Sequence, residues 1–353
     1  MAFGTLTQTL RTLREIDLRS QRRAAEAPFR LFIVGAGDDA RRLADRLSEQ
    51  AGRVGSHPWL LLHSASEPVA SSAASALPMD RLAVLLTRAP DLAPAERAQL
   101  NTFASIGIRA VTMVVHDGGP LPLGAELPRA GEAARGVLVE TGGGAVYDLS
   151  PLAAALLQAT EDRPGTRLAL ARQLPALRPA VVAGLIDDTS RSNAVYAMST
   201  GIAEATPGLS LVIGPADILV LTKNQLMLAF KILLATGRTG SNREMLGQVL
   251  SVIGSGLLFR QIAHELVGMV PVIGLVPKIA VAYAGTYVIG QSVWAWADRG
   301  HRLSRSELRQ QYRRALAAAS EWARRALPGR LGGPVPGDGR EADPVTTGPS
   351  YPS

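Results

Sequence analysis

The chain has 353 residues, of which 47% are apolar, 5% aromatic and 19% charged, and it contains no cysteine. This length corresponds to two domains or to one large domain with appendages. The absence of cysteine excludes a disulfide framework, a thiol nucleophile and a thiolate metal site, and a reducing cytoplasmic compartment is the simplest setting. The net charge of +7 permits contact with nucleic acid or an anionic membrane. Only three of the 37 basic residues are lysine, a bias to which we attach no function.

Residues 1–29 predict a basic amphipathic helix, because leucines at helical spacing alternate with arginines such as Arg11, Arg14, Arg22 and Arg23. The mixed charges exclude a secretory signal in this segment. Two placements remain open for this helix: packing on the next domain, or contact with lipid or a partner.

Residues 30–162 alternate short apolar runs with helical periodicity, which predicts an α/β domain with a parallel sheet. The expected strands are 30–35, 59–63, 82–87, 110–115 and 137–141, and the expected helices are 38–50, 94–106 and 150–159.

The turn after the first expected strand contains Gly35 and Gly37, where such folds bind a phosphate at a helix N-terminus. As Gly35-x-Gly37-x-x-Ala40 the turn fits a loose dinucleotide fingerprint, but the acidic residue expected about 20 positions later is missing. The order of elements also resembles a translation-factor-type small G domain. Its phosphate loop ends in Gly-Lys-Ser/Thr, whereas this chain has Ala40, Arg41 and Arg42.

Two further nucleotide contacts of a G domain are replaced. His116-Asp117-Gly118-Gly119 stands where Asn-Lys-x-Asp would bind guanine, and Glu140-Thr141-Gly142-Gly143-Gly144 stands where a Ser-Ala loop would close over the base. The sequence therefore predicts a degenerate, P-loop-like domain without bound nucleotide, in which Gly35, Gly37 and Arg41 are a vestigial phosphate loop. We predict no catalytic residue, no metal site and no cofactor. The alternative is a nucleotide-binding protein or GTPase that uses an atypical phosphate loop with GTP.

Residues 163–326 become helical and more apolar. Residues 193–208, Asn-Ala-Val-Tyr-Ala-Met-Ser-Thr-Gly-Ile-Ala-Glu-Ala-Thr-Pro-Gly, resemble the opening of domain of unknown function 697, a bacterial helical family. Residues 216–225, 260–268 and 278–287 add to the resemblance, which covers about residues 165 to 315. It implies a membrane-associated helical module that accompanies G domains, and it brings no catalytic residues.

A polar cluster is predicted within this module, formed by Asn193, Lys223, Asn224, Gln225, Arg260, His264 and Glu265. Residues 218–225 imitate a guanine-recognition loop, but Gln225 replaces its aspartate, so we interpret Thr222 as the start of a helix. Because an unpaired arginine is costly in apolar surroundings, Arg260 is expected to pair with Glu265, Asp217 or Glu204.

Membrane contact is suggested by Ile279–Ala297, which is 19 residues without a charge and close to the length of about 20 that a span requires. The candidate residues for the membrane interface are Trp294, Trp296, Arg299, Arg302 and Arg305. The alternative for this run is a hydrophobic helical hairpin buried inside the domain.

Small residues recur at four-residue spacing in two stripes, Gly247, Ser251 and Ser255, and Ala282, Thr286 and Gly290, through which helices could pair within the chain or between copies. Residues 302–325 predict a final basic helix, and residues 327–353 predict a disordered Pro/Gly-rich tail. No nucleic-acid recognition motif accompanies the charge.

Together these patterns predict a non-catalytic, membrane-associated adaptor made of a pseudo-GTPase domain and a helical interaction module. Its expected partners are the inner face of the cell membrane or hydrophobic helices of another protein. Its expected place is the cytoplasmic side of that membrane, peripheral or inserted as a hairpin, with a soluble cytoplasmic protein as the alternative.

Overall fold

The N-terminal half forms a sheet in the computed structural model, which describes residues 17–49, 60–64, 79–88, 92–116, 134–142, 146–147, 149–204, 215–253 and 275–326. The strands are β1 (Phe29–Val34), β2 (Leu60–His63), β3 (Asp80–Thr87), β4 (Arg109–His116), β5 (Ala134–Gly142) and β6 (Val146–Tyr147). Their order is β2-β1-β3-β4-β5-β6, with β1 to β5 parallel and β6 antiparallel to β5. The predicted parallel sheet is confirmed, and β6 is a strand that the sequence did not predict.

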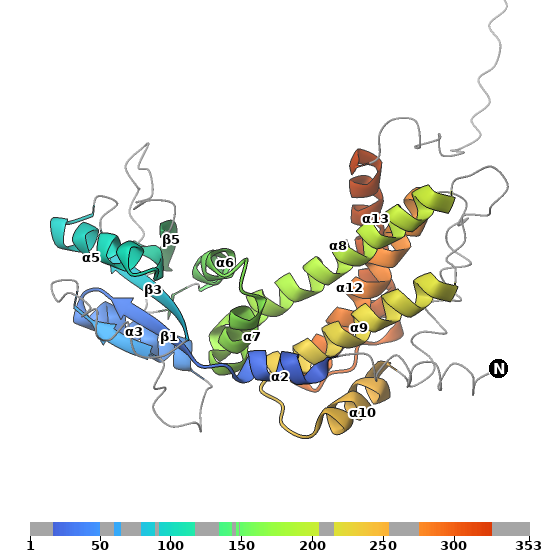
Figure 1. The fold of residues 1–353 in the computed structure, drawn as a ribbon, viewed down its shortest axis with the longest axis horizontal. Helices are drawn as coiled ribbons and strands as arrows, with labels where there is room; N and C mark the ends of the chain where they lie inside the picture. The colour runs from blue at the N-terminus through green and yellow to red at the C-terminus, as the bar shows by residue number, and fades with distance from the viewer. Residues whose placement is uncertain are drawn as a thin grey trace, which may run out of the picture.

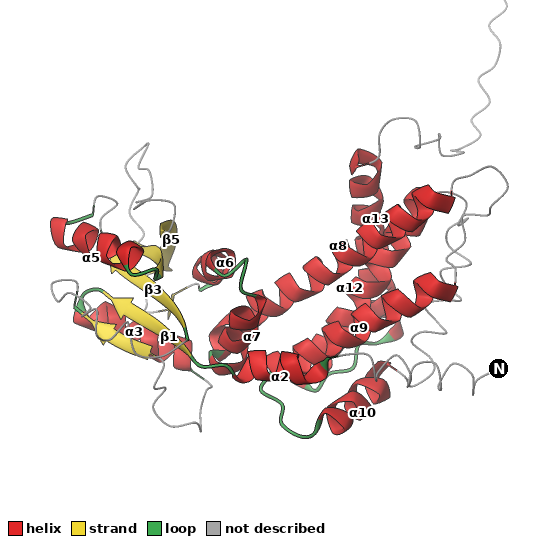
Figure 2. Ribbon diagram, in the orientation of Figure 1, coloured by secondary structure: helices red, strands yellow, loops and turns green. Residues whose placement is uncertain are grey.

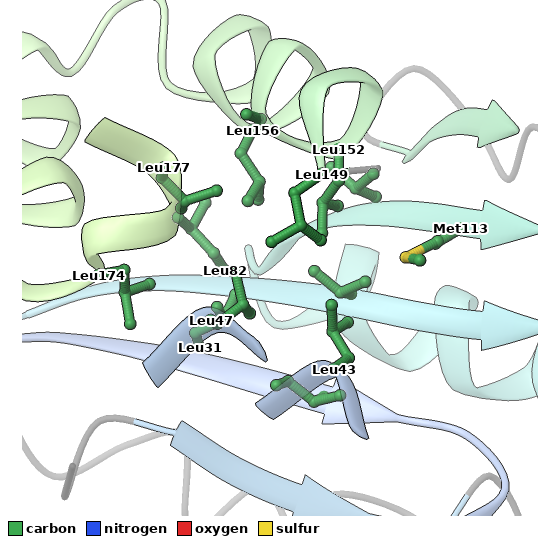
Figure 3. Packing of buried hydrophobic residues seen from close by; sticks show 14 of the residues in the cluster. Leu31, Leu43, Leu47, Leu82, Met113, Leu149, Leu152, Leu156, Leu174 and Leu177 are labelled. Atoms are coloured by element: carbon green, nitrogen blue, oxygen red, sulfur yellow. The ribbon is translucent and has the colours of Figure 1, made fainter. Parts of the chain in front are cut away.

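Helices cover both faces of this sheet, as the continuous apolar runs of its central strands require. Helices α3 (Gly37–Ser48) and α6 (Ser150–Ala159) pack on one face, and α5 (Pro94–Ser105) packs on the other. Figure 3 shows leucines of α3, α6 and the following helical segments converging over β1 and β3. Each covering helix begins within three residues of its predicted start.

The second half is helical and ends in long helices that extend away from the sheet (Figures 1 and 2). Its elements are α7 (Pro164–Gln173), the 3-10 helix η1 (Pro175–Leu177), α8 (Arg178–Glu204), α9 (Pro215–Ala235), α10 (Asn242–Ile253), α12 (Leu275–Arg299) and α13 (Arg305–Ala326). Helix α12 is the central element, because it contacts α8, α9, α10 and α13. The predicted order, an α/β domain followed by a helical domain, is therefore observed.

Helix α2 (Leu18–Glu26) precedes the sheet in sequence but packs on the helical domain. Leu18 and Ala25 are buried in the same apolar cluster as α9. The guanidinium of Arg22 donates to Asn242 Oδ1 at 2.8 Å and to the Gly240 carbonyl at 2.6 Å. Of the two placements open for the N-terminal helix, the structure shows packing for this described part. The α/β domain is thus inserted between α2 and α7.

Helix α7 is buried on two sides. Ala169 and Leu170 belong to the apolar cluster beneath the sheet, whereas Leu168 and Ala171 belong to the cluster of the helical domain. Because one helix supplies side chains to both cores, the two domains share a continuous apolar junction.

Ion pairs fix the loop that leads into α7. Asp80, at the start of β3, accepts hydrogen bonds from Arg163, at 2.9 Å, and from Thr166. Arg109, at the start of β4, forms a two-pronged pair with Asp162, with a distance of 2.7 Å between Nη2 and Oδ2. The hydrogen bonds from Arg109 lower the pKa of Asp162 to about 2. These contacts tie α7 to the sheet edge at which β3 and β4 begin.

Two half-buried arginines donate to carbonyls at or just beyond helix C-termini. Arg172 donates to the Leu234 carbonyl at the end of α9 and to the Arg238 carbonyl just beyond it, at 3.0 and 3.1 Å. Arg178 donates to the Ala171 carbonyl near the end of α7, at 3.0 Å. Burial lowers the pKa of both guanidinium groups. Each arginine thus adds side-chain donors to carbonyls in the last helical turn or just beyond it, where the backbone offers few donors.

Helices α8 and α12 approach closely along the stripe of Ala282, Thr286 and Gly290. A Cβ atom at Gly290 would lie 2.7 Å from Ile186 Cγ1, which is inside van der Waals contact. The structure therefore uses this stripe within the chain. Of the other stripe, Gly247 and Ser251 are exposed on α10, and Ser255 lies outside the described residues.

We predict that Gly290→Ala destabilises the fold by about 1–3 kcal/mol, because the new methyl group overpacks the junction with Ile186. Gly285→Ala, in the same helix, is the matched control, since its Cβ would meet no atom within 4 Å. The control should be neutral or stabilising by up to about 1 kcal/mol through helix propensity. Urea unfolding of both variants measures the difference, and equal effects would contradict the close approach.

Candidate functional site

The strand order places a topological switch point between β1 and β3. In doubly wound sheets with this order, ligands bind in the crevice outside the carboxyl ends of the strands at that point. Here the turn Gly35–Ala36 leads from β1 into α3, and Arg88 follows β3 directly. This edge carries the predicted vestigial phosphate loop and is the first candidate site.

A carboxylate of the chain occupies the N-terminal turn of α3. Asp39 is only 3% exposed, and both of its oxygens accept hydrogen bonds from Arg88, at 2.8 Å from Nε and 3.0 Å from Nη2. A second cation, Arg42, lies 3.9 Å from the same carboxylate. The helix dipole and the guanidinium fork therefore act on an internal anion.

The three residues of the vestigial loop have separate surroundings. A Cβ atom at Gly35 would lie 2.9 Å from Leu86 Cβ and 3.1 Å from the Leu86 carbonyl oxygen, so Gly35 is required by the packing of β1 against β3. Gly37 faces open space, and Arg41 is exposed on α3. Strand packing explains Gly35 without a bound phosphate.

The other nucleotide-contact positions are described only in part. His116 ends β4 and Glu140–Gly142 end β5, whereas 117–119 and 143–144 lie outside the described residues. Within the ranges that the structure describes, no three His, Asp or Glu side chains lie close enough to hold a metal ion.

A buried polar network joins α8, α9 and α12. Thr286 Oγ1 accepts hydrogen bonds from Asn193 Nδ2 at 2.8 Å and from Gln225 Nε2 at 3.2 Å. Its own hydroxyl donates to the Ala282 carbonyl at 2.8 Å, and Asn224 Nδ2 donates to Asn193 Oδ1 at 2.6 Å. The three amides and the Thr286 hydroxyl are thus joined by hydrogen bonds at the helix junction, which is the arrangement expected of a structural core network.

The network brings together three of the seven residues of the predicted polar cluster. Lys223 is half-buried on α9 and belongs to none of the hydrogen bonds that form the network among the described residues. Arg260, His264 and Glu265 lie outside the described residues, so the expected pairing of Arg260 stays a prediction. Thr286 was recognised only as a small residue, because its role depends on two helices that are distant in sequence.

One prediction within this region was wrong. Thr222 is not the start of a helix, because α9 begins at Pro215 and continues through Ala235. Proline favours the first turn of a helix, and this signal places the start correctly. Gln225 is therefore in a helix interior and directs its amide to Thr286 rather than to a base.

The predicted membrane-interface residues form two groups. Trp294 and Trp296 are half-buried against the helical core, and the Arg238 guanidinium lies 4.4 Å from the centre of the Trp296 ring. Arg299, Arg302 and Arg305 are exposed at the turn between α12 and α13. Within the described ranges, no helix combines the length and apolar character that crossing a bilayer requires.

The sequence did not identify Arg88, the partner of Asp39. Forty-nine positions separate these residues, and nothing in the local pattern links them. Because β1 and β3 are neighbours, the cation directly after β3 lies within reach of an acid in the first turn of α3, the helix that follows β1.

No family model matches the chain, and no curated protein and no solved structure matches it.

We predict unequal effects when the Asp39–Arg88 pair is broken from either side. Arg88→Gln leaves a buried carboxylate without its nearer cation and should cost about 3 kcal/mol of stability. Asp39→Asn leaves a guanidinium that is 59% exposed and can be hydrated, so about 1 kcal/mol is expected. Urea unfolding compares the two variants, and a larger loss in Asp39→Asn would contradict this arrangement.

We predict that Thr286→Val destabilises the helical domain by about 2–4 kcal/mol, because two buried amide donors lose their acceptor. Thr189→Val is the matched control, since its half-buried hydroxyl donates to the Leu185 carbonyl of its own helix and, within the described residues, accepts from no other side chain. The control should cost less than about 1 kcal/mol. Thermal unfolding monitored by circular dichroism measures both, and similar losses would show that the network contributes little.

Proposed function

We propose that the chain is a non-catalytic adaptor, in which a nucleotide-free, G-like α/β domain is joined to a helical module that contacts the inner face of a membrane. The observation that carries the first part is the burial of the Asp39 carboxylate, paired with Arg88, at the N-terminus of α3. A carboxylate held at this position repels a phosphate, and it engages the Arg88 guanidinium that would otherwise attract one.

The residue types around the pair add to this proposal. Phosphoryl transfer needs a lysine at the terminal phosphates and a hydroxyl that holds magnesium, and this turn offers Arg41 and Arg42 instead. Arg88 would be the nearest cation for a phosphate, but Asp39 already binds it in a two-pronged geometry. A bound nucleotide would have to displace an ion pair that the chain supplies itself.

The resemblance to domain of unknown function 697 supports the second part. Three of the stretches on which it is based contribute Asn193, Asn224, Gln225 and Thr286 to the junction of α8, α9 and α12. In this proposal the resembling residues build the module, and its outer surface contacts the membrane. Contact with the hydrophobic helices of a partner protein is the alternative use of the same module.

Equilibrium titration of the full chain with labelled GTP, ATP and NAD tests the nucleotide-free part. We expect no binding at micromolar concentration, because the switch point is occupied by Asp39 and Arg88. Micromolar binding of any of the three would overturn the proposal and favour a nucleotide-binding protein with an atypical loop.

Restoring the phosphate loop is predicted to yield weak phosphate binding without turnover. The triple variant Ala40→Gly, Arg41→Lys, Arg42→Ser rebuilds Gly-x4-Gly-Lys-Ser but leaves Asp39 in place. Hydrolysis also needs a positioned magnesium and an oriented water, so one repaired element does not supply it. GTP and ATP should bind with little preference.

The matched control for this variant is Ala40→Gly, Arg41→Gln, Arg42→Ser, which lacks only the lysine. It should bind neither nucleotide, as measured by fluorescence anisotropy with labelled GTP and ATP. GTP hydrolysis above background in the restored variant, or any in the unmodified chain, would show that the domain is a working enzyme.

A further inference from the structure

We propose that the membrane contact is made by an arginine surface on α13 and the turn before it, which lies on anionic phospholipid headgroups without inserting into the bilayer. This inference rests on the proposed function and names the surface and the chemistry of its partner. The arginine surface consists of the exposed residues Arg302, Arg305, Arg313, Arg314 and Arg324.

The five guanidinium groups of this surface are exposed and can bind an anionic partner. Among the residues that the structure describes, none forms an ion pair with these five arginines. The two acids of α13 are engaged elsewhere: Glu307 accepts a hydrogen bond from the Ser304 backbone at 2.7 Å, and Glu321 lies 3.7 Å from Arg325. Guanidinium groups remain charged at any physiological pH. The surface is therefore a strip of positive charge along a helix of 22 residues, about 33 Å long.

The apolar side of α13 is buried against the other helices of the domain. Tyr312, Ala315, Ala319 and Ala323 are buried. Tyr312 and Ala315 share a cluster with Ala284 and Val288 of α12. An amphipathic helix that inserts into a bilayer needs this side for the acyl chains. Only the charged side remains for a partner, so the contact is electrostatic and weakens with salt.

The form of the surface favours lipid headgroups over nucleic acid. Proteins that bind single strands stack bases on exposed aromatic rings, but Tyr312 is buried and Trp322 is half-buried against Ile279 and Ala323. Four of the five arginines lie on α13 and Arg302 lies in the turn before it, and α13 (labelled in Figure 1) packs against α12. A strip of separate cations suits a fluid array of anionic headgroups, to which each arginine near the surface contributes about fivefold in affinity.

The test is cosedimentation of the full chain with phosphatidylcholine vesicles that contain or lack phosphatidylserine, at low and physiological ionic strength. The test variant is Arg313→Gln, Arg314→Gln, Arg324→Gln. The control is Arg23→Gln, Arg97→Gln, Arg243→Gln, which removes the same net charge from exposed positions on α2, α5 and α10. Both sets lie on the surface, so their melting curves should match that of the unmodified chain.

We expect the unmodified chain to bind only the vesicles with phosphatidylserine, with affinity that falls as salt rises. The test variant should bind on the order of a hundredfold more weakly, and the control should keep most of its affinity. Equal losses in both variants would show that net charge rather than this surface governs binding, and would overturn the inference.

Two other outcomes are decisive. If the unmodified chain binds neither kind of vesicle, both the membrane part of the proposed function and this inference are wrong. If the test variant binds vesicles as tightly as the unmodified chain, only this inference is wrong. Titration with labelled single- and double-stranded oligonucleotides completes the experiment. Tighter binding to either, lost in the test variant, would assign the surface to nucleic acid and overturn the lipid proposal.

Discussion

The burial of α7 on two sides is the constraint on which the rest of the structure depends. The chain begins the helical domain with α2, leaves it to build the sheet, and returns through α7. Leu170 packs toward the sheet and Leu168 toward the helices, and each such burial contributes about 1.5–3 kcal/mol. Because one helix belongs to both cores, the domains cannot separate without exposing apolar surface, and the orientation of α8 relative to the sheet follows from it.

The α/β domain places an internal ion pair where doubly wound sheets bind ligands. The sheet order creates a switch point, and the chain fills it with its own anion, Asp39, and its own cation, Arg88. Gly35 is retained for a reason that involves no ligand, since β3 packs against it at Leu86. A helix N-terminus that can bind a phosphate can also hold a carboxylate of the chain itself.

The regular elements of the α/β domain could be predicted from periodicity, since apolar strands alternate with amphipathic helices. The placement of α2 could not, because its leucines fit a lipid surface and a protein core equally well. The Asp39–Arg88 pair and the Asn193–Thr286 hydrogen bond depend on strands and helices that meet only in the fold. The start of α9 at Pro215 could have been predicted from the sequence, because proline favours the first turn of a helix. Arg260 lies outside the described residues, so its predicted pairing is untested.

The half-buried arginines differ from the exposed ones in their tolerance to exchange. Arg172 and Arg178 work through the geometry of a planar fork that reaches carbonyls at helix ends, which a single ammonium group cannot reproduce. Arg313 and Arg324 present charge to solvent, for which lysine is an adequate substitute. Exchange of arginine for lysine would therefore remove hydrogen bonds at Arg172 and Arg178 but leave the charge unchanged at Arg313 and Arg324.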